Sequence, residues 1–157
     1  MLGRRYDEQD CSIARALEVV GERWTLLIVR ESFLGTSRFD GFHHRLGIAR
    51  NVLQKRLERL VEEGVLERSP YQERPVRYEY RLTQEGRDLL PVLVGLQQWG
   101  DRHRAPEAGP RGAIAHASCG GPVNAALQCG RCGATVEERS IAVEVLREPL
   151  TPRAPRA

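Results

Sequence analysis

Three of the four cysteines of the chain lie in one short stretch, HASCGGPVNAALQCGRCG (residues 116–133), which begins with a histidine. His116 and Cys119 form one pair with two residues between them, and Cys129 and Cys132 form a second pair with the same spacing. Zn²⁺ prefers four tetrahedral ligands of this kind, and a two-residue spacing lets one tight turn present both ligands of a pair. The stretch therefore predicts one structural Zn²⁺ per chain, with a closed shell that leaves no open position for catalysis.

Two other interpretations of this stretch stay open. Nine residues separate the two pairs, which is shorter than the usual spacing in zinc modules. The Cys129–Cys132 pair alone could be a metal-free dithiol that responds to oxidation. His116 stands between alanines and could simply be exposed to solvent.

The composition limits where such a site can operate. The chain has 157 residues, of which 41% are hydrophobic and 29% charged, with a net charge of +3. No apolar run reaches the roughly 18 residues that a membrane span needs, and the N-terminus has arginines but no apolar core of a signal peptide. We expect a cytoplasmic protein whose cysteines are kept reduced rather than paired in disulfides. The charge permits a nucleic-acid partner without requiring one.

Hydrophobic periodicity and turn residues predict the elements ahead of this stretch. Four helices come first, and the third and fourth are joined by a short turn containing Gly47, which is typical of a helix-turn-helix. A strand at 65–68, a proline-bounded loop at 69–75 and an alternating strand at 76–82 follow. The first helix is capped by Asp10 and ends at Gly21, and the second runs from Trp24 to Gly35. The third is capped by Thr36–Ser37 and ends at Gly47, and the fourth runs from Ile48 to Gly64. A fifth helix, after the strands, is capped by Thr83 and runs to His103, with a kink or delay at Pro91.

This order predicts a mainly α fold with a small β-wing, a winged helix-turn-helix, followed by a small β-rich cysteine module. The expected domains are a DNA-binding and dimerisation domain at 1–104, a linker at 105–115, a zinc-ribbon-like module at 116–148 with a strand at 140–146, and a disordered tail at 149–157.

The exposed positions of the fourth helix carry groups that can read base edges. Arginine pairs with guanine, asparagine and glutamine pair with adenine, and the start of the recognition helix enters the major groove. Arginines on the wing are suited to phosphate or minor-groove contact. The candidate DNA-binding residues are Ser37, Arg50, Asn51, Gln54, Lys55, Arg56, Arg74 and Arg77. An arginine-rich helix face can also be merely solvated, so this prediction depends on the helix-turn-helix and the basic wing occurring together.

Three segments carry a resemblance to a known family: CSIARALEVVGERWTLLIVRESFLG, RFDGFHHRLGIARNVLQKRLERLVEEGVLER and YQERPVRYEYRLTQEGRDLLPVLVGLQQWGDRH. Over about residues 11–103 the chain resembles HxlR-type transcriptional regulators, a branch of the MarR-like winged-helix proteins. The resemblance implies a homodimer on a palindromic double-stranded DNA operator, with half-sites roughly 34 Å apart. It implies an interface built by the first and last helices, with the candidates Ile13, Leu17, Leu93, Leu96 and Trp99.

Such regulators often carry a cysteine at the position of Cys11, and in some of them it senses oxidants or electrophiles. The start of a helix favours a thiolate, whereas the acidic residues Asp7, Glu8 and Asp10 favour the neutral thiol. Cys11 is therefore a candidate sensor, with ordinary packing at the dimer contact as the alternative.

The leading interpretation is a non-enzymatic, sequence-specific regulator switched by modification or by a small ligand. The alternatives are a metal- or thiol-responsive sensor whose cysteine cluster is the sensing site, and a protein-interaction module that has lost its DNA contacts. No nucleophile set, phosphate loop or paired-carboxylate motif indicates an enzyme.

Overall fold

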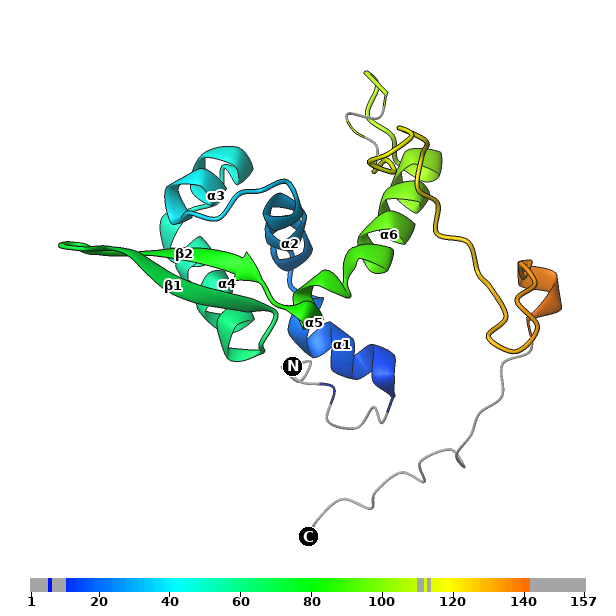
Figure 1. The fold of residues 1–157 in the computed structure, drawn as a ribbon, viewed down its shortest axis with the longest axis horizontal. Coiled ribbons are helices and arrows are strands. Elements are labelled where there is room, and N and C mark those ends of the chain that lie inside the picture. Colours follow the sequence, from blue (N-terminus) through cyan, green and yellow to red (C-terminus); the bar gives the residue numbers. More distant parts are fainter. Residues whose placement is uncertain (1–5, 7–10, 110–111, 113, 142–157) are drawn as a thin grey trace, which may run out of the picture. The chain divides into compact units, whose positions relative to one another are not determined.

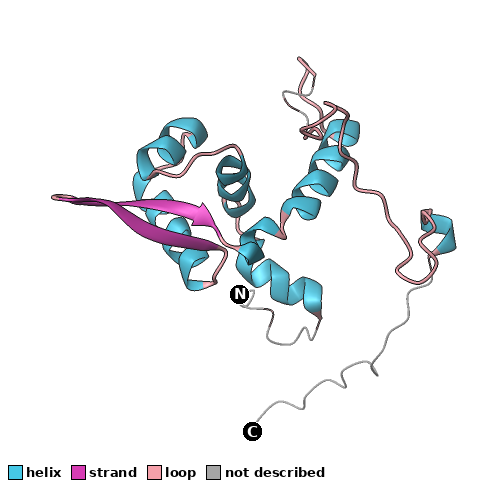
Figure 2. Ribbon diagram, viewed as in Figure 1, coloured by secondary structure: helices cyan, strands magenta, loops and turns pink. Residues whose placement is uncertain are grey.

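The computed structural model describes residues 6, 11–109, 112 and 114–141, and the chain divides into two compact units, Met1–Val123 and Asn124–Ala157. The first unit holds the α-helices and the two strands drawn in Figures 1 and 2, and the short helix near the C-terminal end belongs to the second unit. Its elements are α1 (Ser12–Val20), α2 (Thr25–Phe33), α3 (Phe39–Leu46), α4 (Arg50–Glu62), β1 (Leu66–Glu73), β2 (Val76–Leu82), α5 (Gln84–Arg87) and α6 (Leu90–His103). This order confirms the predicted winged helix-turn-helix, mainly helical with a two-stranded wing.

The core of the first unit lies between α2, α3, α4 and the base of the wing. Leu53, Leu57 and Leu60 fall on one face of α4 and are fully buried, because leucines three and four positions apart share a helix face. They pack in one cluster with Phe42 of α3 and Ile28 of α2. This cluster fixes α4 on α3, so the opposite face of α4 is left for other contacts.

The turn between α3 and α4 is held by Gly47 and Ile48. Gly47 has φ +62°, a left-handed conformation that glycine adopts without cost, and its N–H donates to the His43 carbonyl at 3.0 Å. Ile48 is buried in the core, and its carbonyl accepts a hydrogen bond from Nδ1 of His43 at 2.8 Å. The turn therefore sets the angle at which α4 leaves α3.

The wing is longer than the sequence predicts. β1 and β2 pair antiparallel from Leu66↔Leu82 to Glu73↔Val76, with one register shift between Pro70 and Gln72. Residues 69–73, expected in the loop, belong to β1, because their backbone pairs with β2 although their side chains do not alternate. The outer half of the wing is exposed, and Val76 lies on the surface.

Two predicted helix starts are wrong. The N-cap of α1 is Cys11 instead of Asp10, since the Cys11 Sγ accepts a hydrogen bond from the Ala14 N–H. The N-cap of α3 is Arg38, because the Ser37 carbonyl accepts from the Tyr80 N–H at 2.7 Å and Arg38 bridges to Glu79. The residues before α3 thus join the wing as a short extended segment.

The predicted interruption at Pro91 is confirmed. The helix expected from Thr83 divides into α5 and α6, and Pro91 lies in the first turn of α6, where its missing N–H leaves no hydrogen bond unmade. The Thr83 hydroxyl caps α5 by accepting from the Gly86 N–H at 3.1 Å, as predicted. Leu34 is 62% exposed at the end of α2, where it forms the C-cap.

The cysteine-rich stretch has less regular structure. Among the described residues from 114 onward there are two isolated antiparallel bridges, Ala115↔Pro122 and Gln128↔Thr135, and one 3-10 helix, Glu138–Ser140. Its β character is therefore limited to these bridges, and residues 142–146 of the predicted strand fall outside the described residues, as does the tail at 149–157. In the described part of the chain, no helix is both long and apolar enough to span a membrane.

Candidate nucleic-acid interface

The outward face of α4 presents polar side chains near its start. Arg50, Asn51, Gln54 and Lys55 are all exposed, opposite or beside the buried leucine face. Among the residues that the structure describes, the side chains of Asn51 and Lys55 have neither a hydrogen-bond partner nor an ion-pair partner. These two groups are available to a ligand without any internal contact being broken.

Arg50 is held in place by contacts with α3. Its Nη2 donates to the Asp40 carboxylate at 2.9 Å, and its guanidinium lies 5.0 Å from the centre of the Phe39 ring. An exposed ion pair of this kind stabilises by only about 0.2–1 kcal/mol. A bidentate arginine–guanine contact contributes about 1–3 kcal/mol of discrimination. Asp40 therefore orients Arg50 without preventing it from binding a base.

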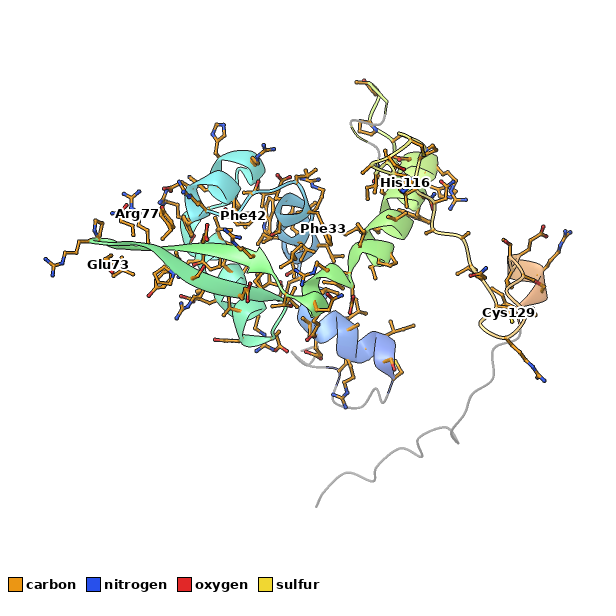
Figure 3. The ribbon with its side chains drawn as sticks, in the orientation of Figure 1. Phe33, Phe42, Glu73, Arg77, His116 and Cys129 are labelled. Carbon is orange, nitrogen blue, oxygen red and sulfur yellow. The ribbon has the colours of Figure 1, made fainter. Side chains whose placement is uncertain are left out.

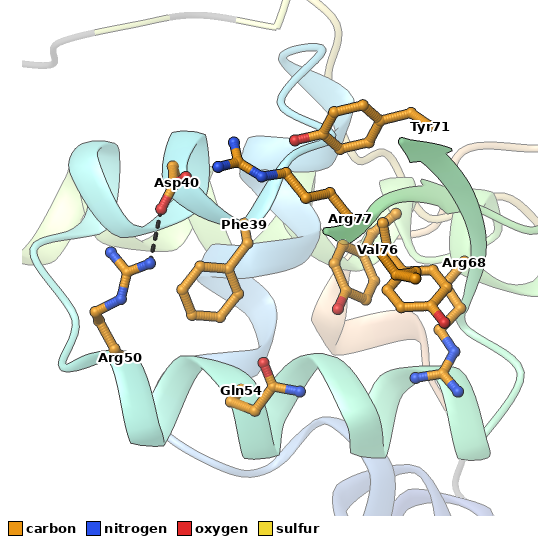
Figure 4. A pocket seen from close by; sticks show the side chains of 10 residues that line it. Phe39, Asp40, Arg50, Gln54, Arg68, Tyr71, Val76 and Arg77 are labelled. Atoms are coloured by element: carbon orange, nitrogen blue, oxygen red, sulfur yellow. Dashed lines mark hydrogen bonds and ion pairs between the residues drawn. The ribbon is translucent and has the colours of Figure 1, made fainter. Parts of the chain in front are cut away.

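A cleft of about 300 Å³ lies between the starts of α3 and α4 and the wing (Figure 4). Three arginines and one aspartate line it, which gives a net charge of +2. Aromatic rings supply most of the remaining wall. The lining residues are Phe39, Asp40, Arg50, Gln54, Arg68, Tyr71, Val76, Arg77, Tyr78 and Tyr80. Such a surface suits a nucleic-acid backbone, because the arginines can bind its phosphates while the aromatic rings contact its sugars or bases.

Arg77 continues this basic surface along the wing, and Arg74 lies in its terminal turn. Both are exposed, and Figure 3 shows Arg77 and Glu73 toward the free end of the hairpin. Arg68 lies 5.0 Å from the Tyr78 ring and Arg38 lies 4.3 Å from the Tyr71 ring. Arg68 was not among the residues predicted from the sequence to bind DNA. Arg68 pairs with Tyr80 across the wing, so its position could be predicted only from the register of β1 against β2.

Of the eight predicted DNA-binding residues, three line this cleft, namely Arg50, Gln54 and Arg77, and two others lie on different surfaces. Arg56 is on the other flank of α4, where its guanidinium pairs with Glu22 at 3.0 Å and its side chain is only 26% exposed. Ser37 borders a separate shallow hollow of about 290 Å³ between α2 and α3. The other six candidates are exposed on α4 and the wing, namely Arg50, Asn51, Gln54, Lys55, Arg74 and Arg77.

Helices α1 and α6 each present an exposed apolar stripe. On α1 the stripe consists of Ile13, which is 74% exposed, and Leu17 one turn later. On α6 it consists of Val92, Leu96 and Trp99, at spacings that place them on one helix face. Leu93, predicted at the dimer interface, is instead part of the core cluster, because it lies about 100° around the helix from Val92, on the flank of the stripe that faces the core. Val92 was missed by the sequence analysis and takes its place on the exposed stripe.

The four cysteines are all free thiols. Cys11 is exposed at the start of α1, with its Sγ 3.3 Å from the Ala14 nitrogen. In the first unit, Nδ1 of His116 lies 3.3 Å from the Cys119 Sγ. In the second unit, backbone N–H groups of Cys132 and Arg131 hydrogen-bond the Cys129 sulfur and lower the pKa of its thiol. No group of three or more His, Cys, Asp or Glu side chains among the described residues is arranged to hold a metal.

Comparison with known proteins agrees with this geometry. The model of the HxlR-like helix-turn-helix family matches residues 19–108. The uncharacterized HTH-type transcriptional regulator Rv3095 of Mycobacterium tuberculosis (strain H37Rv) is 45% identical over 143 residues, which cover 91% of this chain and 89% of the relative.

Two solved structures are also similar. The crystal structure of PA1607, a candidate transcription factor, superposes with a TM-score of 0.78 at 35% identity, covering 89% of this chain and 98% of that one. The reduced form of the redox regulator HypR superposes with a TM-score of 0.56 at 28% identity, covering 60% of this chain and 94% of that one. The family and these relatives are regulators rather than enzymes. The chain belongs to the HxlR-like helix-turn-helix family of transcriptional regulators.

Proposed function

We propose that the chain is a homodimeric, sequence-specific regulator that binds a palindromic double-stranded DNA operator. In this proposal α4 enters the major groove, and the wing contacts the phosphate backbone or the minor groove. The observation that carries it is the exposed polar start of α4 beside the basic cleft, with Asn51 and Lys55 unpaired among the described residues.

The roles of individual residues follow from their chemistry. Asn51 can form a bidentate contact with adenine, and Arg50 can do so with guanine after leaving Asp40. Lys55 and the exposed Arg77 carry point charges suited to phosphate, which set affinity and register more than sequence preference. Arg56 is left out of this interface, because its side chain is only 26% exposed on the other flank of α4, where it pairs with Glu22.

The dimer is inferred from the apolar stripes of α1 and α6. Ile13, Leu17, Leu96 and Trp99 are exposed in the single chain, together with Val92. Large apolar side chains that are exposed together along a helix face mark an association site. In a two-fold dimer the stripes of both protomers are buried, and the dimer presents two recognition helices, as a palindromic operator requires.

A selection from random double-stranded DNA with the purified full chain tests the proposal. We expect enrichment of a two-fold symmetric sequence, whose affinity falls steeply with salt because phosphate contacts release counterions. Asn51→Ala should weaken binding to the selected sequence far more than to a scrambled one. Arg102→Ala, which removes an exposed arginine from α6, is the matched control and should bind as the wild type does. Equal affinity of the wild type for selected and scrambled DNA would refute sequence-specific binding.

A second candidate function is a thiol response at Cys11. Its sulfur caps α1, one of the two helices with the apolar stripes, so modification would remove the cap and place a new group beside the stripe. The similarity to HypR, a redox regulator, supports this candidate. Hydrogen peroxide converts a thiol to a sulfenic acid with release of water, and an electrophilic small molecule could act as inducer at the same sulfur. If Cys11→Ser and the wild type bind the selected DNA identically before and after peroxide treatment, this candidate fails.

A further inference from the structure

Gln54 lies on the cleft face of α4, one helical turn after Arg50. It lines the cleft together with Arg50 and with Arg68 of the wing, and Figure 4 shows its side chain rising from α4 between these two arginines. Its amide has one acceptor oxygen and two N–H donors, the groups with which a protein reads adenine. A free amide can turn over and exchange these groups, so base reading is most selective when its orientation is fixed.

A carboxylate one turn further along α4 fixes the Gln54 amide. Nε2 of Gln54 donates a hydrogen bond to Oε1 of Glu58 at 2.6 Å. Residues four positions apart lie on the same face of a helix, so this contact needs no change in the backbone. An ionised carboxylate can only accept, so Nε2 and not Oε1 of Gln54 must face Glu58. The chemistry of the pair therefore decides the orientation of the amide.

Glu58 is on the flank of α4 that faces the wing. Tyr80 of β2 lines the cleft together with Gln54. Burial raises the pKa of the Tyr80 phenol, the positive charge of Arg68 lowers it, and the negative charge of Glu58 raises it further. Both charged groups therefore lie near this ring, at the base of the wing. The contact between Gln54 and Glu58 thus belongs to the cleft and not to the opposite flank of α4.

The bond to Glu58 leaves half of the Gln54 amide for a ligand. Among the residues that the structure describes, the Gln54 side chain makes no other hydrogen bond. The second N–H and Oε1 are therefore available side by side. This donor and acceptor match N7 and the N6 amino group that adenine presents in the major groove.

The fold itself gives little reason for a carboxylate at position 58. Glu58 is exposed, and a side-chain pair at this spacing adds only slightly to the stability of a helix. A negative charge beside a DNA-binding surface also repels the phosphates. The orientation of Gln54 is a contribution that offsets this repulsion at the place where the cleft and α4 meet.

We propose that Glu58 is a positioning residue for base reading, which holds the Gln54 amide with Oε1 and one N–H directed at an adenine. This inference rests on the proposed function, because it requires α4 in the major groove. Glu58 acts through Gln54 and touches no base itself. Without Glu58 the Gln54 side chain must be ordered on binding, which costs about 2- to 10-fold in affinity for a side chain of this kind.

The contact is tested first in the free chain, without DNA. The side-chain amide signals of Gln54 in a proton–nitrogen NMR spectrum are identified by their loss in Gln54→Ala. We expect one amide proton to be shifted downfield by the carboxylate, and to move to the value of a free glutamine in Glu58→Ala. The same spectra show that each variant is folded. Identical Gln54 signals in the wild type and in Glu58→Ala would overturn the inference, whatever the chain binds.

Glu62→Ala is the matched control. It removes the same carboxylate group from the same helix, but Glu62 pairs with Arg59 at 3.6 Å, and neither residue lines the cleft. The Gln54 amide signals should therefore be unchanged in Glu62→Ala. Both variants also lose one negative charge, so a general gain in affinity for DNA is common to them.

Base reading is then tested on the DNA that the wild type selects. The position read by Gln54 is the one at which Gln54→Ala loses its preference, and we expect adenine there. The measured quantity is the ratio between the Kd for DNA with another base at this position and the Kd for DNA with adenine. This ratio should be about 5- to 100-fold for the wild type and near one for Gln54→Ala. Glu58→Ala should lower it by about 2- to 10-fold, and Glu62→Ala should leave it unchanged.

A double-mutant cycle separates this role from a general effect on DNA binding. In a Gln54→Ala background, Glu58→Ala should not change the ratio any further, because its effect passes through the amide. The inference is overturned if Glu58→Ala keeps the wild-type ratio, lowers the preference at every position alike, or acts equally without Gln54. A wild-type chain that selects no sequence would refute the proposed function as well, whereas a selected sequence read independently of Glu58 would refute this inference alone.

Discussion

Truncation of Trp99 should weaken the proposed dimer more than any other single change on the apolar stripes. Trp99 is 49% exposed in the single chain. An aromatic side chain buries about 150–250 Å², so about 100 Å² of Trp99 remains to be covered by a partner. At about 25 cal/mol per Å², that area corresponds to about 2.5 kcal/mol per chain. Two-fold symmetry counts the residue twice, which gives about 5 kcal/mol for the dimer.

This value is an upper bound on the change in dimer affinity. Ordering of side chains at an interface offsets part of the area term, and Trp99 keeps its contacts with His103 and Arg104 in the single chain. We therefore expect Trp99→Ala to raise the dimer Kd by at least about 100-fold, and by about 5,000-fold if the whole area term is realised.

Sedimentation velocity over a range of protein concentrations measures this shift directly. Leu34→Ala is the matched control, because Leu34 is an exposed apolar residue at the end of α2, outside α1 and α6. Its dimer Kd should equal that of the wild type. If Trp99→Ala associates as tightly as the wild type, or if Leu34→Ala weakens association equally, the stripes on α1 and α6 are not the interface.

Three further predictions concern stability and DNA binding. Leu57→Ala should lower the free energy of unfolding by about 2–5 kcal/mol in chemical denaturation, because Leu57 is a fully buried member of the core cluster; a loss below about 0.5 kcal/mol would show that the core is not where the structure places it. Lys55→Ala should weaken binding to selected and scrambled DNA alike and lower the salt slope by about one; a loss confined to the selected sequence would instead make Lys55 a base-reading residue. Burial raises the pKa of Tyr80 above its usual 10.0, so the unfolded chain loses this proton first and stability should fall as the pH rises above about 10 and through the folded-state value. Tyr80→Phe should lose less stability than the wild type over that alkaline range, and equal losses would show that Tyr80 does not contribute.

Local signals in the sequence were sufficient for most of the helical part of the fold. Thr83 and Gly47 were recognised as a helix cap and a helix end, because a capping hydroxyl and a left-handed glycine act on their own neighbours. The effect of Pro91 was likewise local. Each of these depends on residues within about one helical turn, so no knowledge of the tertiary structure was needed.

The misplaced elements depend on partners that are distant in sequence. Residues 69–73 join β1 only because the backbone of β2 lies beside them, and no alternation of side chains indicates it. Ser37 was expected to cap α3, but its carbonyl accepts from Tyr80, more than forty residues away. Tertiary hydrogen bonds overrode the local preference in both cases.

The candidate site shows the same division. Periodicity placed Arg50, Asn51 and Lys55 correctly on the exposed side of α4. It placed Arg56 with them because that residue is also outside the leucine stripe, but Glu22 holds it from the opposite flank. A helical pattern separates buried from exposed positions, whereas the choice between the two exposed flanks requires the neighbouring elements.

The interface on α4 and the stripe on α6 are joined through one small set of backbone contacts. The Thr83 N–H donates to the Val65 carbonyl at 3.1 Å, and the Thr83 hydroxyl donates to the Gly64 carbonyl at 2.6 Å. A Cβ on Gly86 would lie 2.2 Å from the same Val65 carbonyl, so α5 can approach β1 this closely only because residue 86 is glycine. The residues that follow α4 are thereby fixed to the helix that leads into α6. In the proposed dimer, this contact would link each recognition helix to the helix that carries one of the apolar stripes.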